Sequence, residues 1–563
     1  MTPLESAVNE WIADDVDPSS IEELRTLLAR SASDPEALEE LKDRFRTRLQ
    51  FGTAGLRGIM GAGPNRMNRA VVIRAARGLI DYLSAHVDAP KVVIGNDARH
   101  HSRQFALDTA GVVTAAGGEA YLLPDPVPTP VLAYAVRALN ADAGVMVTAS
   151  HNPAADNGYK VYLGGRMVPD NERGVQIVPP YDAEISQMID AAPAANQIPR
   201  SQTPAIATKS GSPDPIPGIV DRYVETISEG DPPLAPIRIV HTAMHGVGSP
   251  VALSALAKAG FTDVVSVAAQ KDPNPDFPTV SFPNPEEPGA IDMALALARE
   301  VGADVVIAND PDADRCAVAV PDPRTGWRML HGDELGSVLA EELAGTKGVF
   351  TNSVVSSRQL EVIAASQGRG YVRTLTGFKW MGRVKDLAYA YEEAIGYCAR
   401  PDIVRDKDGL STAVLVARLV SRLKSEGQTI IGLLDDLARR NGLYLTSQLS
   451  VRCTDLNEIS EVMERLRTHP LTTLAASEVT RTIDLAQGWE GLPPTDGIMM
   501  ITAKNDRVVV RPSGTEPKVK CYLEVVLPVV PDASFEDLTA IRGAARDRLD
   551  LIKADLNTAL FQS

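Results

Sequence analysis

A strand–helix–strand pattern that occurs three times constrains the fold of this chain more than any other feature. Residues 91–123, 237–267 and 347–374 each contain an apolar strand, a polar loop, a helix and a second apolar strand. Each unit then continues through a further helix to a third strand. Strands that alternate with helices are typical of parallel α/β sheets, and recurring units indicate repeated domains. The sequence therefore predicts three similar α/β domains with largely parallel, mixed sheets.

The two ends of the chain follow other patterns. Residues 1–50 are expected to be helical, with Asp34 as a helix cap and Pro35 at the first helical position. After residue 440, short strands alternate with turns, which is typical of an antiparallel sheet in a smaller α+β domain. We also expect a linker at residues 206–218 and a hairpin-like crossing at 321–334. The expected domains are 1–212, 213–325, 326–440 and 441–563.

Each of the three third strands ends in a cluster of polar residues. The clusters are residues 148–153, 309–315 and 392–396. Ligands of α/β sheets bind outside the carboxyl ends of the strands. We therefore expect the three ends to converge on one central cleft.

Asp310, Asp312 and Asp314 alternate directly after an apolar strand. In an extended loop alternate residues share a side, so three carboxylates would face one point, which is costly unless a hard divalent cation binds them. An EF-hand is excluded, because Arg315 stands in place of its glycine and Pro321 in place of its glutamate. An aspartyl-nucleophile phosphatase loop would need a threonine that is missing here. A solvated acidic loop is the remaining alternative, and we favour a metal site.

Ser150 lies in the first polar cluster, next to His151. It lacks the GxSxG frame of a hydrolase, and a lone Ser–His pair is usually part of a turn. Lys160 strengthens the case, because a turn at Asn157-Gly158 would bring it back towards the same loop. A serine, a lysine and a triple-Asp metal site together indicate phosphoryl transfer.

Two further segments are candidates for anion binding. Residues 511–518 combine an arginine, hydroxyl groups and a glycine that frees backbone N–H groups. Residues 51–58 form a glycine-rich stretch that contains Arg57, but it matches neither GxGxxG nor the P-loop, so nucleotide binding is not indicated. The histidines at 100, 101, 241 and 245 are expected to be isolated surface or packed residues rather than ligands.

The net charge of the chain limits the kinds of partner that it is expected to bind. Lys and Arg number 56 against 73 Asp and Glu, a net charge of −17, which disfavours nucleic acid and anionic membranes. We see no apolar signal segment at the N-terminus and no apolar run near the roughly 20 residues of a membrane span. The four cysteines are far apart and form no CxxC pair, so a reducing cytoplasm is the expected location. The expected partner is a small molecule.

Six motifs in order resemble the α-D-phosphohexomutase family, which includes phosphoglucomutase and phosphomannomutase. They cover nearly the whole chain, and the forms at 51–57 and 392–396 are most similar to the branch that also contains phosphopentomutases. The motifs are FGTAGLRG (51–58), TASHNPAADNGYK (148–160), DPDADR (310–315), TGFK (376–379), EEAIG (392–396) and RPSGTEPK (511–518). The resemblance implies four domains around a central cleft.

The resemblance also implies the roles of individual residues. Ser150 matches the serine that carries the phosphoryl group, and it completes a Mg²⁺ site with the three aspartates. Arg57, Lys160 and Arg315 match the basic residues around the transferring group, with Lys160 chosen for proton transfer, and His151 holds the phosphoserine loop or the substrate. The implied substrate-binding residues are Thr376, Gly377, Phe378, Lys379, Glu392, Lys407, Arg511, Ser513, Gly514 and Thr515.

The implied reaction interconverts a sugar 1-phosphate and a 6-phosphate through a bisphosphate, with sugar 1,6-bisphosphate as activator and phosphoryl donor. Glucose and mannose phosphates are the expected substrates. Many members that act on these sugars have a serine two residues after the glutamate, where this chain has Ala394. A phosphopentomutase acting on 1- and 5-phosphates therefore stays open, as do a metal-dependent phosphatase and a non-catalytic sugar-phosphate-binding protein. A monomer or a homodimer is expected.

Overall fold

In the computed structural model the chain forms two compact units, which are described separately. Unit 1 contains residues 1–319 and 396–421, and unit 2 contains residues 320–395 and 422–563. The residues that the structure describes are 2–123, 126–201, 218–453, 456–512 and 518–561.

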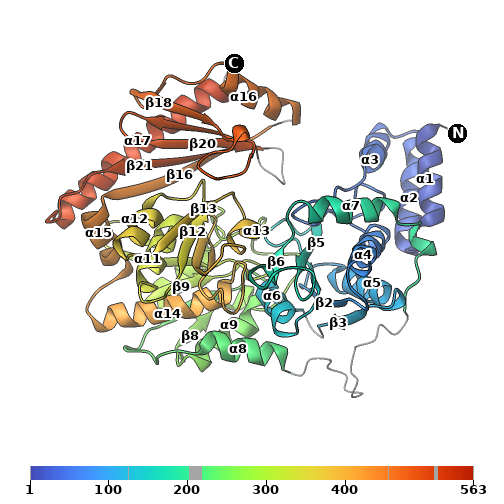
Figure 1. The fold of residues 1–563 in the computed structure, drawn as a ribbon, viewed down its shortest axis with the longest axis horizontal. Coiled ribbons are helices and arrows are strands. Elements are labelled where there is room, and N and C mark those ends of the chain that lie inside the picture. Colours follow the sequence, from blue (N-terminus) through green and yellow to red (C-terminus); the bar gives the residue numbers. More distant parts are fainter. Residues whose placement is uncertain (1, 124–125, 202–217, 454–455, 513–517, 562–563) are drawn as a thin grey trace. The chain divides into compact units, whose positions relative to one another are not determined.

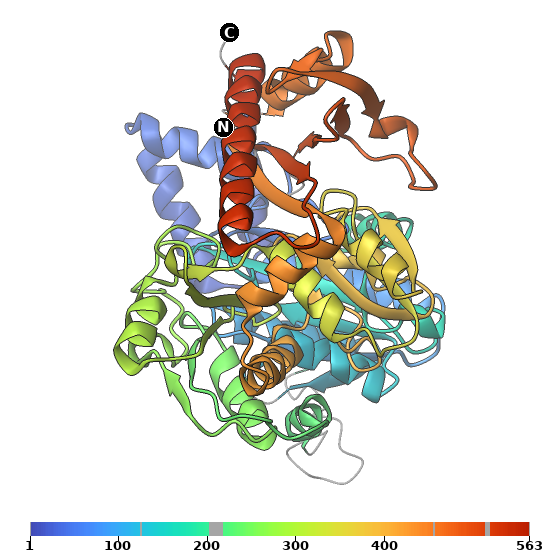
Figure 2. The ribbon, with the colours of Figure 1, turned by 90° about the vertical axis from the view of Figure 1, so that its left-hand side faces the viewer.

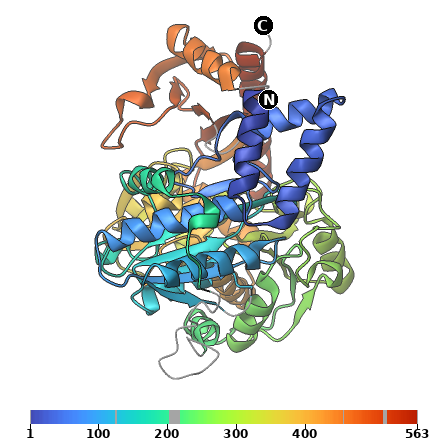
Figure 3. The same ribbon diagram turned by 90° about the vertical axis from the view of Figure 1, so that its right-hand side faces the viewer.

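Three helices open unit 1, as the sequence predicts (Figure 3). They are α1 (Pro3–Asp14), α2 (Pro18–Ser31) and α3 (Pro35–Arg46). The Asp34 side chain accepts hydrogen bonds from the backbone N–H groups of Glu36 and Ala37, and Pro35 is the first residue of α3. The apolar faces of the helices enclose a small core around Leu41, which is fully buried.

The first repeated pattern forms a mixed sheet with helices. Its elements are β1 (Leu56–Ile59), α4 (Arg69–Ser84), β2 (Lys91–Asn96), α5 (Ser102–Ala115), β3 (Glu119–Leu122), α6 (Thr129–Ala138), β4 (Ala143–Val147), β5 (Asp156–Leu163), β6 (Val175–Gln176) and α7 (Tyr181–Ala191). The strand order is β1-β5-β4-β2-β3, and β6 pairs with β5. Strand β2 is parallel to β3 and β4, whereas β5 is antiparallel to β1 and β4. Because right-handed crossovers run in opposite directions from β2 to β3 and from β3 to β4, α5 and α6 lie on opposite faces.

The second repeated pattern completes unit 1. Its elements are α8 (Ile219–Ser228), β7 (Ile239–Thr242), α9 (Gly248–Lys258), β8 (Val264–Ser266), α10 (Asp292–Val301), β9 (Val305–Ala308) and β10 (Ala317–Asp322), whose residues after 319 belong to unit 2. The strand order is β10-β9-β7-β8, with β7 parallel to β8 and β9 and with β10 antiparallel to β9. Strand β15 (Gly396–Cys398) and most of α14 (Gly409–Ser425) also belong to unit 1.

The third repeated pattern lies in unit 2. Its elements are β11 (Gly326–Met329), α11 (Gly332–Glu342), β12 (Val349–Ser353), α12 (Gln359–Ser366), β13 (Gly370–Thr374), α13 (Phe378–Met381), β14 (Leu387–Glu392) and α15 (Ile430–Asn441). Strand β12 is parallel to β13 and β14 and lies between them. Strand β11 neighbours β10, so the predicted hairpin-like crossing at 321–334 is confirmed.

The chain ends in an antiparallel sheet covered by a long helix (Figures 1 and 2). Its elements are β16 (Leu443–Arg452), α16 (Leu456–Thr468), β17 (Thr473–Leu474), β18 (Ser477–Asp484), β19 (Ile498–Thr502), β20 (Arg507–Pro512), β21 (Lys518–Leu527) and α17 (Phe535–Phe561). The strand order is β16-β21-β20-β19-β18-β17, and every neighbouring pair is antiparallel. Helix α17 packs along β16 and β21. This arrangement confirms the predicted C-terminal α+β domain.

The threefold repetition predicted from the sequence is confirmed. In each repeat the first strand lies between the second and the third, in the orders β4-β2-β3, β9-β7-β8 and β14-β12-β13. The predicted linker at 206–218 falls almost wholly outside the described residues, and the four domain ranges stay a prediction. Across the described ranges, no helix has both the length and the apolar character needed to cross a bilayer.

The predicted turn at Asn157-Gly158 is wrong, because both residues lie inside β5. Gly158 pairs with Arg57 of β1. A Cβ atom at residue 158 would lie 2.5 Å from the carbonyl oxygen of Thr148 and 2.9 Å from that of Leu56. The glycine is therefore required by the close approach of neighbouring backbones.

We predict that Gly158→Ala destabilises the sheet of residues 56–176, because backbone atoms cannot move aside as a flexible side chain could. Overpacking of this kind costs about 1–3 kcal/mol. The matched control is Gly52→Ala, since no atom lies within 4 Å of a Cβ atom built at that position. Thermal unfolding should show a lower midpoint for Gly158→Ala alone, and equal midpoints for the two variants would contradict this account of β5.

Candidate active site

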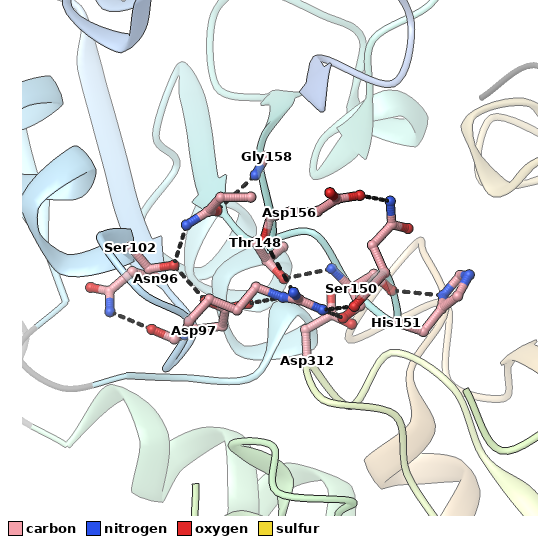
Figure 4. Close-up of polar contacts among 12 residues, drawn as sticks. Asn96, Asp97, Ser102, Thr148, Ser150, His151, Asp156, Gly158 and Asp312 are labelled. Carbon is pink, nitrogen blue, oxygen red and sulfur yellow. Dashed lines mark hydrogen bonds and ion pairs between the residues drawn. The ribbon is translucent and has the colours of Figure 1, made fainter. Parts of the chain in front are cut away.

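The carboxyl ends of β4 and β9 meet in unit 1. Ser150 follows β4, and its hydroxyl donates a hydrogen bond to Oδ2 of Asp310, which follows β9, at 2.9 Å. Thr129, at the start of α6, donates its backbone N–H to the carbonyl oxygen of Asp312 at 2.9 Å and its hydroxyl to Oδ2 at 2.7 Å. Figure 4 shows Ser150, His151 and Asp312 close together. Two of the three predicted polar clusters thus form one site.

Ser150 is held in an unusual backbone conformation. Its φ is +52°, in the left-handed region that a residue with a Cβ atom seldom adopts. Its backbone N–H donates to Oγ1 of Thr148 at 2.9 Å. Such strain persists where the surrounding structure enforces it, and it is common at functional sites. The conformation directs the Ser150 hydroxyl towards Asp310.

His151 lies beside the Ser150 hydroxyl, with Nδ1 3.3 Å from Oγ. Burial, together with the positive charges of Arg315 and Arg57, lowers the pKa of His151 well below its ordinary value. The imidazole is therefore neutral near pH 7. It can form a hydrogen bond with the Ser150 oxygen without adding a positive charge to the site.

The three aspartates form a compact, buried cluster. One carboxylate oxygen from each of Asp310, Asp312 and Asp314 lies within 4.8 Å of the others. The expectation of an extended loop is wrong, because Ala313 has a φ of +54° and its N–H bonds to the carbonyl oxygen of Asp310 at 2.8 Å. A tight turn, rather than strand-like alternation, brings the carboxylates together.

These carboxylates suit a hard cation. Oδ1 of Asp312 and Oδ1 of Asp314 are buried and accept no hydrogen bond from the residues that the structure describes. Burial and the neighbouring Asp312 and Asp314 charges raise the pKa of Asp310 well above its ordinary value, which is the repulsion that a divalent cation would relieve. Within the described ranges, no other set of three His, Cys, Asp or Glu side chains is placed to share an ion.

Lys160 reaches the aspartates from β5. Its backbone pairs with Met146 of β4, so antiparallel pairing, rather than a turn, brings it to the site. Nζ lies 2.7 Å from Oδ2 of Asp312 and 3.0 Å from Oδ2 of Asp314. Burial opposes a charge on Lys160, but the two carboxylates outweigh it and raise the pKa of Lys160. The side chain therefore carries a proton at neutral pH.

Further positive groups surround the cluster. Lys407, which follows β15, has Nζ 3.4 Å from Oδ2 of Asp314. Arg57 of β1 donates to Oδ1 of Asn152 at 3.2 Å. The backbone N–H of Arg315 donates to Oδ1 of Asp310 at 3.0 Å. The structure thus brings every residue predicted around the transferring group into unit 1.

The other predicted substrate-binding residues lie in unit 2. Arg511 donates a hydrogen bond to Oγ1 of Thr376, so the segments at 376–379 and 511–512 meet. Gly377 has a φ of +103°, and the Phe378 ring is buried, so it supports the segment from inside. Glu392 is the half-buried last residue of β14. Ser513, Gly514 and Thr515 lie outside the described residues.

Two residues of interest were given no role by the sequence analysis. Thr129 orients Asp312, but no motif marks it. Glu393 follows Glu392, and its Oε2 accepts hydrogen bonds from the hydroxyls of Ser356 at 2.8 Å and Ser353 at 3.3 Å. Residue 393 lies in the polar cluster and the EEAIG motif at 392–396, but only Glu392 was given a role.

Family models match this chain from domain to domain. The matching models are phosphoglucomutase/phosphomannomutase α/β/α domain I at residues 48–194, domain II at 221–325, domain III at 331–440 and the C-terminal domain at 451–529. The chain belongs to the phosphoglucomutase/phosphomannomutase family. The predicted family and fold class are therefore confirmed.

Individual members of the phosphoglucomutase/phosphomannomutase family are similar over most of their length. The Haemophilus influenzae protein named "Probable phosphomannomutase" is 44% identical, covering 81% of this chain and 93% of its own. The phosphopentomutase of Mus musculus is 34% identical over 93% of this chain and 90% of its own. A family protein from Burkholderia thailandensis shares the fold, with a TM-score of 0.68, 19% identity and coverage of 92% of this chain and 99% of its own. The chain is a phosphosugar mutase, an intramolecular phosphotransferase, and the relatives' names leave its sugar open.

We predict that Mg²⁺ raises the melting temperature of the metal-free protein through the aspartate cluster. At a hundredfold excess over the dissociation constant, binding to the folded state contributes about 2.7 kcal/mol, or roughly 5 °C or more for a large domain. Asp314→Asn should abolish most of this shift, because it replaces one of the buried oxygens that accept no hydrogen bond. Asp276→Asn, at an exposed ion pair with His100, is the matched control and should keep the shift. An equal shift in both variants would refute the assignment of the cluster.

Proposed function

We propose that this enzyme interconverts hexose 1-phosphates and hexose 6-phosphates by passing a phosphoryl group through Ser150. The observation that carries this proposal is the buried contact between the Ser150 hydroxyl and Asp310, with Lys160 and Lys407 beside the same aspartates. A nucleophile, a cation site and fixed positive charges are the parts that phosphoryl transfer needs.

The proposed step moves one phosphoryl group between two oxygens. The bond from phosphorus to Oγ of phosphorylated Ser150 breaks, and a new bond forms to the free hydroxyl of a sugar monophosphate. The proton of that hydroxyl passes by way of Lys160 to the departing Ser150 oxygen, which becomes a hydroxyl again, and the product is a sugar bisphosphate. After the bisphosphate has turned over, its other phosphoryl group returns to Ser150 and the monophosphate isomer leaves. Sugar 1,6-bisphosphate is therefore also the proposed activator.

Fixed charges in unit 1 would lower the barrier of this step. Arg57, Lys160 and Arg315 are placed to balance the negative charge on the transferring oxygens, which is effective because Lys160 is buried, the two arginines are half-buried and all three are already oriented. Lys160 holds a proton between two carboxylates, so it can give a proton to the departing serine oxygen and remains our candidate for proton transfer. His151 is neutral and is assigned to holding the phosphoserine.

Mg²⁺ is the cofactor that we assign to Asp310, Asp312 and Asp314. Oxygen-only ligands favour a hard cation over zinc. When bound, the ion would neutralise charge on the phosphoryl oxygens, and the oxygen on Ser150 would complete its ligand set.

The sugar and its second phosphate are assigned to unit 2 and to Lys407. Thr376, Gly377 and Lys379 would orient the sugar, supported by Phe378, and Glu392 would accept hydrogen bonds from its hydroxyls. The phosphate that does not react would bind Arg511 together with Ser513, Gly514 and Thr515.

The proposal also includes the preferred sugar, the cellular location and the oligomeric state of the enzyme. Glucose and mannose phosphates are preferred over pentose phosphates, and the test is a panel of glucose, mannose and ribose 1-phosphates, each assayed with sugar bisphosphate. The similarity to both a phosphomannomutase and a phosphopentomutase makes ribose 1-phosphate the essential comparison. A cytoplasmic location and a monomer or homodimer remain predictions.

We predict that Ser150→Ala lowers turnover by at least roughly a hundredfold, since the relay then has no nucleophile. Intact-mass measurement should show a phosphorylated species in the wild type after incubation with sugar bisphosphate and none in the variant. Ser425→Ala, at an exposed serine on α14, should behave as wild type. Near-normal mutase activity in Ser150→Ala would contradict the proposed mechanism.

We predict that Arg511→Ala impairs the reactions of the 1-phosphate and the 6-phosphate by similar factors. In a mutase the sugar binds in two orientations, and the phosphate that does not react occupies the same site in both. A charge-assisted contact is worth about 1.5–3 kcal/mol, or roughly ten- to a hundredfold in kcat/KM. Arg546→Ala, at an exposed arginine of α17, is the control.

A phosphatase acting on a single phosphate would show no such symmetry. If Arg511→Ala leaves both directions unchanged, residues 511–512 form a structural turn and the phosphate-binding assignment is wrong. Release of inorganic phosphate in place of the isomeric monophosphate would favour the phosphatase.

A further inference from the structure

Arg99 lies under the serine loop, which we define as residues 148–156, and bonds to its backbone. Nη1 donates to the carbonyl oxygens of Pro153 at 2.7 Å and Asp156 at 3.1 Å. Nη2 donates to the carbonyl oxygens of Ser150 at 2.7 Å and Asn152 at 2.5 Å. Both ends of one planar guanidinium group therefore fix four carbonyl groups of one short loop.

The guanidinium group is itself held from the remaining directions. Nε lies 3.4 Å from Oδ2 of Asp97, and the side chain is 1% exposed. The ring of Phe277 lies against the group, with its centroid 4.9 Å from Cζ. A buried guanidinium is costly unless its donors and its charge are balanced. Here the four carbonyls accept hydrogen bonds from both Nη atoms, and Asp97 balances the charge.

Asp97 is fixed as well. Its Oδ1 accepts the Ser102 hydroxyl at 2.6 Å and the backbone N–H of Arg99 at 2.9 Å. Figure 4 shows Asp97 and Ser102 on one side of this network and Ser150 on the other. The end of β2 and the start of α5 therefore form a rigid base on which the serine loop rests.

The serine loop needs such a base because its own conformation is strained. Ser150 has a φ of +52°, and a strained residue of this kind costs about 1–3 kcal/mol unless its surroundings compensate. Within the loop, the backbone contributes the hydrogen bonds from Asn152 N–H to Ala149 and from Asp156 N–H to Pro153. The four carbonyls turned inward would repel one another without a shared donor.

We propose that Arg99 is a positioning residue for phosphoryl transfer: by binding four carbonyls of the serine loop it keeps the Ser150 oxygen aimed at the aspartate cluster. None of the bonds described joins Arg99 to the Ser150 hydroxyl or to the aspartate cluster at 310–314. Arg99 therefore acts through the backbone of the serine loop. This inference rests on the proposed role of Ser150 as the phosphoryl carrier.

Arginine is required rather than a positive charge alone. A lysine ammonium is a compact group on a flexible stem, whereas guanidinium presents a rigid planar fork of donors. A lysine at residue 99 would keep the charge near Asp97 but could not hold the loop from two sides at once. Since a displacement of about 1 Å can cost a hundredfold in rate, Arg99→Lys should slow the transfer step strongly.

The test measures transfer to Ser150 directly. Wild type and Arg99→Lys are mixed with glucose 1,6-bisphosphate, quenched at short times and analysed by intact mass, and kcat and KM are measured with glucose 1-phosphate. We expect the phosphorylation rate and kcat of Arg99→Lys to fall roughly ten- to a hundredfold, with KM unchanged within about twofold because the substrate-binding residues are untouched.

Arg44→Lys is the matched control. Arg44 is also buried in unit 1, donates to Glu23, Glu40 and the carbonyl oxygen of Ala62, and lies in α3, away from the serine loop. A purely structural effect would lower the melting temperature of either variant and leave the rate per folded molecule unchanged. Hydrogen exchange should become faster at residues 149–156 in Arg99→Lys alone.

Asp97→Asn keeps the test decisive if Arg99→Lys fails to fold. The variant preserves the shape of the side chain and removes the charge that faces Nε, so kcat should fall with KM unchanged. The inference is overturned if either folded variant phosphorylates Ser150 at the wild-type rate. If the wild type itself gains no phosphoryl group on Ser150, the proposed function has failed instead.

Discussion

Three buried carboxylates within 4.8 Å of one another are the feature on which the rest of unit 1 depends. Like charges at this distance in a buried site repel strongly. Two lysines from distant segments of the chain offset this repulsion: Lys160 from β5 and Lys407 from the segment after β15. The antiparallel addition of β5 to a parallel sheet makes sense in this light, because it delivers a lysine to the same sheet edge as Ser150.

The repeated domains also share a backbone device. After the third strand, each repeat has a non-glycine residue in the left-handed region: Ser150 with φ +52°, Ala313 with φ +54° and Ile395 with φ +53°. A β-branched residue there is a genuine outlier. The sharp reversal turns the polar residues back over the strand end, in the first repeat presenting a hydroxyl and in the second gathering the carboxylates. The three repeats thus share one backbone geometry after the third strand. The side chains on that turn give each repeat a different chemical role.

Much of this architecture could be predicted from the sequence, because strand and helix periodicity is local and the aspartates lie within five residues. The error at Asn157-Gly158 shows the limit: the same dipeptide that favours a turn serves in β5, where Gly158 lets two backbones approach. The tight turn at Ala313 could not be predicted either, because alternating aspartates fit an extended loop equally well. Arg99 carries no sequence signal of its role, because its partners are carbonyl groups, which every residue possesses. Sugar preference depends on hydroxyl contacts that the motifs do not specify.

The central claim is that the phosphoryl group on the product comes from Ser150. The most direct measurement is a rapid-quench experiment in which enzyme carrying radiolabelled phosphate on Ser150 meets unlabelled sugar 1-phosphate in excess. The account predicts that the label leaves the enzyme within a single turnover and appears first in sugar bisphosphate and then in monophosphate. Label that stays on the enzyme while product accumulates, or that is released as inorganic phosphate, would contradict it.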